Sequence, residues 1–250
     1  MPRFQHGSVE IAFLDEGEGE PIVLIHGFAS TKEVNWVNPG WVATLTRAGR
    51  RAIALDNRGH GASSKRYDPL DYHVDKMADD VRALMDHLGL DRCDTMGYSL
   101  GARIGAFLAV QQPDRVRSLI LAGLGIHLVE DSGSAERIVA ALEAPSVDAV
   151  TDPGARTYRV FAEETKGDLK ALAACIRGAR QMLTRDQVGA IGMPVLIAVG
   201  TKDTAAGSAH ALAASMPSAE VLDIPGRDHM RAVGDKVFKS GALDFLARRP

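Results

Sequence analysis

The chain has 250 residues, of which 46% are hydrophobic and 24% are charged, and its formal net charge is −3 at pH 7. This length accommodates one large domain with a substantial core, and the composition is typical of a globular protein. The slightly negative charge comes without any basic stripe, so a nucleic-acid partner is not expected.

Seven stretches have the pattern of β-strands. The first two are residues 9–14, which precede a glycine-rich turn, and residues 22–25, which are continuously apolar like a strand covered on both faces. The others are residues 51–55, 93–96, 119–122, 195–199 and 220–224. Helical spacing of apolar residues fills the segments between them, namely residues 77–88, 100–108, 205–216 and 233–247. Strands that alternate with helices predict an α/β fold with a mostly parallel sheet covered on both faces.

One region interrupts this alternation. Between about residues 125 and 192 there is no strand of the buried type, and short helical segments occur instead at residues 135–144, 154–164 and 168–182. Asp152 and Asp168 have the positions of residues that begin helices. We interpret the region as a helical insertion lying over the sheet. The core domain would then comprise residues 1–124 and 193–250, and residues 125–192 would form a small helical cap.

The most informative motif is Gly-Tyr-Ser-Leu-Gly at residues 97–101, between a predicted strand and a predicted helix. In that context Ser99 would occupy a strained turn that exposes its hydroxyl at the edge of the sheet, with the glycines leaving room for the turn. A serine hydroxyl becomes a good nucleophile only when a neighbouring base takes its proton. The motif therefore predicts a histidine and an orienting carboxylate elsewhere in the chain.

His229 is the preferred base among the eight histidines, because it lies in a loop just after the last predicted strand and before the final helix. Asp203 follows the strand at residues 195–199 and so belongs at the carboxyl edge of the sheet, where open α/β folds bind ligands. Asp228 is a poorer candidate, since the side chains of adjacent residues diverge. The order Ser99, Asp203, His229 matches the order of nucleophile, acid and base in one fold.

An oxyanion hole requires two backbone N–H groups aimed at the oxygen that becomes negative. Leu100 would supply one of them, because the first amides of a helix have no partner within the helix. The loop His26-Gly27-Phe28, after the strand at residues 22–25, would supply the other from the Phe28 amide.

Five motifs together resemble those of the α/β-hydrolase family. They are residues 26–28, 56–64, 97–101, 200–203 and 226–229, and they span nearly the whole chain in the family's order. The resemblance implies a mostly parallel sheet of eight strands flanked by helices, with the insertion as its cap. It also implies that Ser99 is the nucleophile, with Asp203 as the acid and His229 as the base. Phe28 and Leu100 are then the oxyanion hole.

A serine at position 99 favours attack on acyl carbons, whereas dehalogenases and epoxide hydrolases of this family carry aspartate there. This leaves esters, thioesters, lactones, peroxyacid formation and cleavage of diketones. Our first choice is a carboxylesterase-type serine hydrolase that acts on small to medium acyl chains through an acyl-enzyme. We expect a mostly apolar substrate pocket, lined by Leu124, Ile126, Leu128, Val129, Val160 and Phe161.

Two alternatives stay open. Arg103 lies one helical turn after Ser99, where it could pair with a substrate carboxylate. Residues 97–103 are also similar to stretches in relatives that eliminate pyruvate or hydrolyse carbon–carbon bonds, which would make this chain a hydrolase or lyase for an anionic substrate. The second alternative is a non-catalytic ligand receptor of the same fold, because such relatives can keep the triad.

No cofactor and no metal are expected. Residues 59–64 lack the third glycine of a dinucleotide-binding loop, and Cys93 and Cys175 form neither a disulfide framework nor a zinc spacing. The first residues contain no apolar signal segment, and no apolar run reaches the roughly 18 residues that a membrane helix needs. We therefore expect a cytoplasmic enzyme whose partner is a small-molecule ester and not a membrane. The sequence gives no indication of the oligomeric state.

Overall fold

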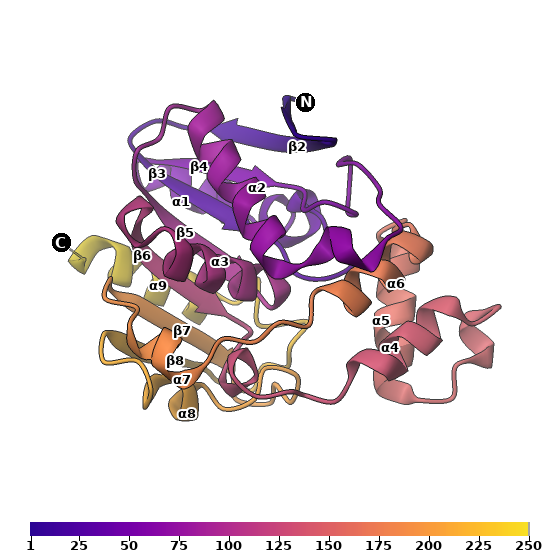
Figure 1. Cartoon of the computed structure of the whole chain (residues 1–250). Helices are drawn as coiled ribbons and strands as arrows, with labels where there is room; N and C mark the ends of the chain where they lie inside the picture. Colours follow the sequence, from indigo (N-terminus) through magenta and orange to yellow (C-terminus); the bar gives the residue numbers. More distant parts are fainter. Residues whose placement is uncertain (250) are drawn as a thin grey trace.

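The computed structural model describes residues 1–249 and contains a central β-sheet with helices on both faces (Figure 1). The strands are β1 (Arg3–His6), β2 (Val9–Glu16), β3 (Glu20–Ile25), β4 (Arg50–Leu55), β5 (Cys93–Tyr98), β6 (Val116–Ala122), β7 (Val195–Gly200) and β8 (Ala219–Ile224). Their order across the sheet is β1-β2-β4-β3-β5-β6-β7-β8. The strands from β3 to β8 are parallel to their neighbours, whereas β1 pairs antiparallel with β2 and β2 with β4. The predicted α/β fold with a mostly parallel, eight-stranded sheet is confirmed.

The register of the parallel strands brings the loops that follow them to one edge. Ile25, the last residue of β3, pairs with Leu55 of β4 and with Gly97 of β5. Ala122 of β6 pairs in turn with Ala198 of β7. Since all these strands run the same way, the segments that leave their carboxyl ends begin side by side, and this is the edge at which open α/β sheets place their sites.

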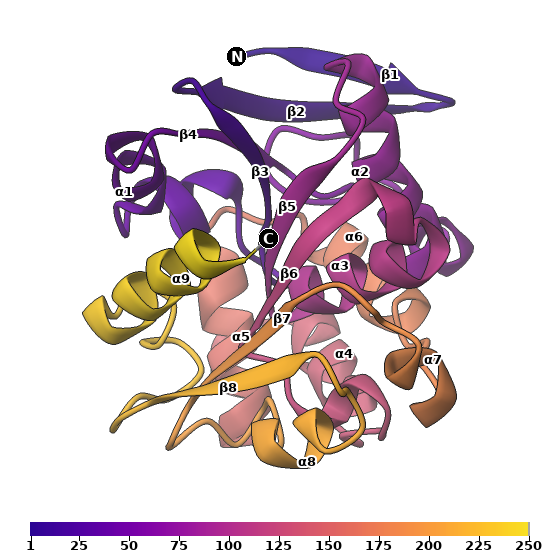
Figure 2. The same cartoon turned by 90° about the vertical axis from the view of Figure 1, so that its left-hand side faces the viewer.

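Two groups of helices cover the two faces of the sheet (Figure 2). The helices and helical turns of the core are η1 (Glu33–Val37), α1 (Trp41–Arg47), η2 (Pro69–Tyr72), α2 (Val74–His87), α3 (Leu100–Gln111), η3 (Pro113–Arg115), α8 (Ala209–Ala213) and α9 (Lys236–Arg248). Helices α1 and α9 lie on one face, where the rings of Trp41 and Phe238 pack edge to face at 4.7 Å. Helices α2 and α3 lie on the other face, and α2 buries Met77, Val81 and Leu84 there. The apolar spacing of α2 thus has the role predicted for it.

The chain between β6 and β7 forms η4 (Ile126–Leu128), α4 (Ala135–Glu143), η5 (Val147–Ala149), α5 (Pro153–Glu164), α6 (Leu169–Gly178) and α7 (Arg185–Gly189). Figure 1 shows α4, α5 and α6 gathered beside the core, whereas α7 lies apart from them. The carboxylates of Asp152 and Asp168 accept hydrogen bonds from the amides of Ala155 and Ala171, so both residues cap helices as predicted. We propose that α4, α5 and α6 form the cap. No helix between residues 1 and 249 combines the length and apolarity needed to cross a bilayer.

Candidate active site

Ser99 occupies the sharp turn between β5 and α3, and its backbone has φ 54° and ψ −113°. A positive φ is rare for a residue with a side chain and stores strain. The two glycines of the motif make this turn possible by close packing. A Cβ on Gly97 would lie 2.1 Å from the Gly101 carbonyl oxygen, and a Cβ on Gly101 would lie 1.9 Å from that of Ile25. Both positions therefore exclude any side chain.

The structure brings Ser99, His229 and Asp203 together from three separate loops. Nε2 of His229 lies 3.0 Å from the Ser99 hydroxyl oxygen, and Nδ1 lies 2.7 Å from a carboxylate oxygen of Asp203. The other Asp203 oxygen accepts hydrogen bonds from the amides of Ala205 and Ala206, at 2.9 and 3.0 Å. Because the buried carboxylate can only accept, it fixes the proton on Nδ1 and leaves Nε2 free to take a proton from the serine.

The loop after β3 lies directly against the turn that carries Ser99. Its Gly27 amide donates a 3.0 Å hydrogen bond to the side-chain oxygen of Asn35, and a Cβ on Gly27 would lie 3.2 Å from the Tyr98 carbonyl oxygen. Within residues 1–249, the amides of Phe28 and Leu100 donate no hydrogen bond. Two N–H groups beside the nucleophile are thus available to an oxygen of a bound molecule, and their role as an oxyanion hole remains our prediction.

Buried histidines shape this loop. The Asn57 amide donates to Nε2 of His26 at 3.0 Å, and burial lowers the pKa of His26, so its ring stays neutral and structural. The ring of His60 packs against the rings of His26 and Phe28, at 5.2 and 5.9 Å. Burial also lowers the pKa of His60, to about 3.

Two cavities meet at Ser99. The first, which we call the Arg103 pocket, has a volume of about 150 Å³ and is lined by Leu100, Arg103, Leu124 and Ile138. The charged and partly exposed side chains of Glu130, Asp131 and Arg180 also line it. The second, the His229 pocket, has a volume of about 310 Å³ and is lined by Val34, Pro39, Phe161, His229, Met230 and Val233. Phe28, Ser99 and Tyr158 line both, so they form the boundary between the two.

The predicted pocket residues divide into two groups. Leu124 and Arg103 line the Arg103 pocket, and Phe161 lines the His229 pocket. The expectation for Ile126, Leu128, Val129 and Val160 is corrected, because none of them lines either cavity, and Val160 instead lines a separate groove over α5. The turn η4 directs Leu128 and Val129 into the main core, where Leu128 is fully buried, and the Ile126 side chain packs beside Gly207.

Three residues contribute to the site although the sequence did not identify them. Tyr158 of α5 reaches from the cap to Ser99, and Asn35 holds the loop of Phe28. Tyr98 donates a hydrogen bond from its hydroxyl to the backbone carbonyl of His229. Tyr98 lies inside the Gly-Tyr-Ser-Leu-Gly motif, whereas Tyr158 and Asn35 lie in no motif, so no sequence pattern could have identified them.

Arg103 is held beside the nucleophile by backbone groups. Its guanidinium donates to the carbonyls of Gln181 and His127, at 2.8 and 2.5 Å. Burial lowers the pKa of Arg103 to about 10, so the group is still positively charged at neutral pH. Among residues 1–249, no group of three or more His, Cys, Asp or Glu is arranged to hold a metal ion.

The sequence and the fold are similar to those of known proteins. A family model described as the alpha/beta hydrolase fold matches residues 20–143. The chain is 32% identical over 230 residues to the dihydrolipoyllysine-residue acetyltransferase component of the acetoin cleaving system of Pseudomonas putida, a match that covers 85% of this chain and 59% of that protein. It is 28% identical over 164 residues to 3-oxoadipate enol-lactonase 2 of Acinetobacter baylyi, covering 60% of this chain and 61% of that protein.

Among solved structures, a hydrolase from Pseudomonas aeruginosa PA01 superposes with a TM-score of 0.83 at 24% identity, over 98% of this chain and 97% of that one. The chain spans about three fifths of the length of the two curated relatives. Shorter matches include haloalkane dehalogenases of Mycobacterium and a 2-hydroxymuconate semialdehyde hydrolase of Pseudomonas, so the similar proteins do not share one substrate.

Proposed function

This chain belongs to the α/β-hydrolase family, and from that premise we propose that it is a serine hydrolase that cleaves carboxylic esters through an acyl-enzyme. The observation that carries the proposal is the geometry at His229. One ring nitrogen is 3.0 Å from the Ser99 hydroxyl and the other is 2.7 Å from the Asp203 carboxylate. These distances are those at which a histidine takes a proton from a serine while a carboxylate orients the ring.

Acylation begins when the Ser99 oxygen adds to the ester carbonyl carbon and its proton passes to Nε2 of His229. The carbonyl oxygen becomes negative and accepts hydrogen bonds from the amides of Phe28 and Leu100. The imidazolium, stabilised by Asp203, then gives the proton to the leaving alcohol oxygen. The alcohol departs and the acyl group stays on Ser99.

Deacylation repeats these steps with water. Water enters beside His229 after the alcohol leaves, and Nε2 takes one of its protons as the oxygen attacks the acyl carbon. The tetrahedral intermediate uses the same two amides. His229 then returns the proton to Ser99, which releases the carboxylic acid and restores the enzyme.

The proposal is tested with a short activated ester, p-nitrophenyl butyrate, and with a fluorophosphonate that labels reactive serines. The wild-type chain is expected to turn over the ester and to be labelled at Ser99, and Ser99→Ala is expected to lose both properties while it keeps its melting temperature. Full esterase activity in Ser99→Ala would overturn the proposal. Labelling without any turnover would favour a ligand receptor.

A second candidate is cleavage of a carbon–carbon bond in an anionic substrate, and Arg103 is the observation that favours it. The guanidinium lines the pocket next to Ser99, its two hydrogen bonds go to carbonyl groups, and no ion pair within residues 1–249 includes it. A substrate carboxylate in this pocket would complete the pairing that a buried guanidinium favours.

The two candidates are separated by a substrate panel that compares short neutral esters with diketones that carry a carboxylate. Carbon–carbon cleavage predicts a higher kcat/KM for the diketones and its loss in Arg103→Met. Ester hydrolysis predicts the reverse order of substrates. Arg103 also hydrogen-bonds to the backbone carbonyls of Gln181 and His127, so its replacement could destabilise the fold. The melting temperature of Arg103→Met is therefore measured alongside its activity.

A further inference from the structure

The two cavities at Ser99 are not equivalent in the proposed reaction. The tetrahedral carbon formed on Ser99 carries the serine oxygen, the oxyanion, the leaving oxygen and the acyl chain. The leaving oxygen must lie near Nε2 of His229, because this nitrogen returns the proton to it. His229 lines only one of the two cavities, and Leu100, whose amide faces the oxyanion, lines the other. The leaving alcohol therefore extends into the His229 pocket and the acyl chain into the Arg103 pocket.

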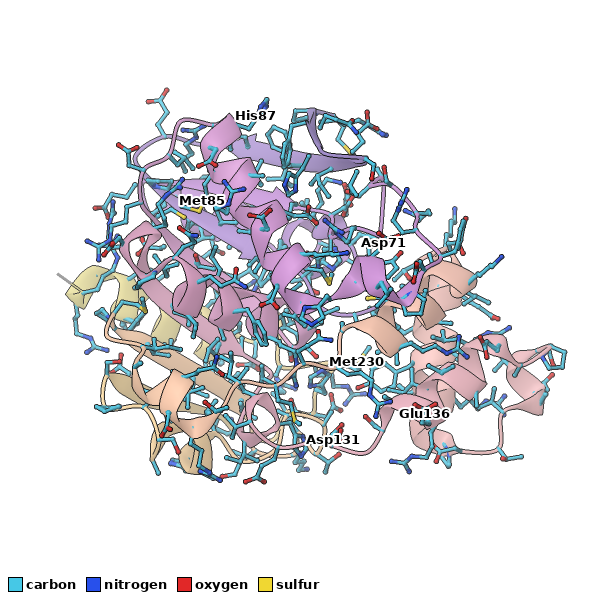
Figure 3. The ribbon with its side chains drawn as sticks, viewed as in Figure 1. Asp71, Met85, His87, Asp131, Glu136 and Met230 are labelled. Carbon is cyan, nitrogen blue, oxygen red and sulfur yellow. The ribbon has the colours of Figure 1, made fainter. Side chains whose placement is uncertain are left out.

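The His229 pocket continues outward along the cap. A groove of about 380 Å³ runs over α5. It is lined by Val160, Phe161 and Met230, by Pro153 and Thr157, and by the charged side chains of Arg156 and Glu164. It shares Phe161 and Met230 with the His229 pocket, so the two hollows adjoin. Met230 lies on the side of the core that faces the cap helices (Figure 3), and 41% of its surface is exposed. An extended apolar chain that starts at Ser99 would cover this exposed methionine.

The Arg103 pocket has the smaller volume of the two cavities, and charged side chains form part of its lining. Its volume is about 150 Å³, and its lining includes the partly exposed side chains of Glu130, Asp131 and Arg180. These side chains are already paired, since Arg180 bonds to Glu136 at 2.6 Å and lies 3.9 Å from Asp131, and Arg185 bonds to Glu130 at 2.7 Å. Asp131 and Glu136 are labelled in Figure 3. A long apolar acyl chain would have to displace or desolvate these charged side chains, which is unfavourable.

We infer that the substrates of this chain are esters of extended apolar alcohols with short acyl groups. The inference rests on the proposed ester hydrolysis and adds the direction of the substrate. Phe161, Met230 and Val160 are the residues that set the specificity for the alcohol. The acyl group is confined to the space between Leu100, Leu124 and Ile138.

The test uses two matched ester series. One keeps acetate and lengthens the alcohol from methyl to hexyl, and the other keeps methanol and lengthens the acid from acetate to hexanoate. We expect kcat/KM to rise at least tenfold along the alcohol series and to fall along the acid series. A rise along the acid series, or equal values in both, would overturn the inference.

The variant Val160→Asn tests whether the groove over α5 causes the preference for long alcohols, because Val160 lines this groove and neither cavity at Ser99. It should lower kcat/KM for hexyl acetate about three- to tenfold and leave methyl acetate unchanged. The matched control is Val147→Asn, which makes the same change in η5, between α4 and α5, at a residue that lines none of the three hollows. An equal loss for both esters in Val160→Asn, or no loss for either, would contradict the inference.

A second measurement does not depend on ester turnover. Linear alcohols should slow the labelling of Ser99 by a small fluorophosphonate, with 1-hexanol several-fold more effective than methanol, and Val160→Asn should remove the difference. Labelling slowed by hexanol without hydrolysis of any ester would overturn the proposed function and keep the apolar subsite. Ester hydrolysis without protection by hexanol would overturn the subsite and keep the function.

Discussion

The hydroxyl of Tyr98 donates a 2.5 Å hydrogen bond to the backbone carbonyl of His229, and the two rings lie 5.5 Å apart. The residue that precedes the nucleophile is thereby tied to the residue that activates it. Burial raises the pKa of Tyr98 well above its usual value, so the hydroxyl keeps its proton and remains a donor. Gly123 permits this contact, because a Cβ there would lie 2.8 Å from the Tyr98 ring.

Tyr98→Phe should lower kcat about five- to tenfold and leave KM for a short ester nearly unchanged. The variant removes one hydrogen bond, worth about 1 to 1.5 kcal/mol, that holds the loop of His229 in place. Steady-state kinetics with p-nitrophenyl butyrate measure the effect. The control is Tyr67→Phe, which removes an exposed hydroxyl that bonds to Asp168, at a residue that lines neither cavity at Ser99. A change confined to KM would contradict a positioning role for Tyr98.

Asp203→Asn should reduce kcat by about 10⁴-fold, because an amide no longer fixes the proton on the ring nitrogen that faces it. Within residues 1–249, the carboxylate of the neighbouring Asp228 accepts hydrogen bonds from the amides of Met230 and Arg231 and lies 3.9 Å from the Arg231 guanidinium. Asp228→Asn should therefore cost less than tenfold. Both rates are measured under saturating ester, with circular dichroism to compare the folds. Equal losses in the two variants would assign the orienting role elsewhere.

Gly101→Ala should prevent normal folding or lower the free energy of unfolding by about 3 kcal/mol or more, since its methyl group would overlap the Ile25 carbonyl. Gly192→Ala is the matched control, because nothing lies within 4 Å of a Cβ at that position. Urea unfolding of the two variants gives the comparison. Similar midpoints for both would show that the turn tolerates a side chain.

The stability of the fold should decrease as the pH falls below about 6.5, and His60 is one cause. The unfolded chain protonates this histidine near pH 6.5, whereas in the fold burial lowers its pKa to about 3. Nε2 of His60 is buried without a hydrogen-bond partner within residues 1–249, so an added proton would find no acceptor. Between these two pKa values the unfolded state binds the extra proton, which costs the fold up to about 1.4 kcal/mol per pH unit.

This pH dependence is checked by urea unfolding at pH 7 and pH 5. His60→Leu should show a smaller loss of stability between the two values than the wild type. The control is His210→Leu, because His210 is exposed and, within residues 1–249, pairs with Asp223 alone. An identical slope in wild type and His60→Leu would refute the contribution of His60.

The strands could be predicted where their burial requires a recognisable pattern of apolar residues. The fully buried residues of β3 and β7 form continuous apolar runs, and these predicted their strands. Strand β1 was missed because only Phe4 among its residues is buried and the strand exists through its pairing with β2. Helix α8 is shorter than predicted, because Asp203 binds the first amides of the segment and Ser208 begins the helix later.

The site, too, could be predicted only where the residue pattern along the chain fixes the position of a side chain. Ser99, Asp203 and His229 could be selected because each follows a predicted strand, and the carboxyl ends of parallel strands share one edge. The pocket could not be predicted in this way. Leu124 and Leu128 are both buried leucines near the start of the insertion, but of the two only Leu124 lines one of the two cavities at Ser99. Tyr158 reaches Ser99 only through the tertiary packing of α5, which no local pattern encodes.

The guanidinium of Arg103 holds the two ends of the segment that carries α4, α5 and α6, since it binds the carbonyls of His127 and Gln181. Both ends of this segment are thus hydrogen-bonded to a residue of α3, the helix that directly follows Ser99. The segment between His127 and Gln181 can be lengthened, shortened or replaced by a different sequence while these two hydrogen bonds to Arg103 stay the same. A chimera that keeps Arg103 and these two junctions would carry a new lining for the pocket on an unaltered catalytic frame.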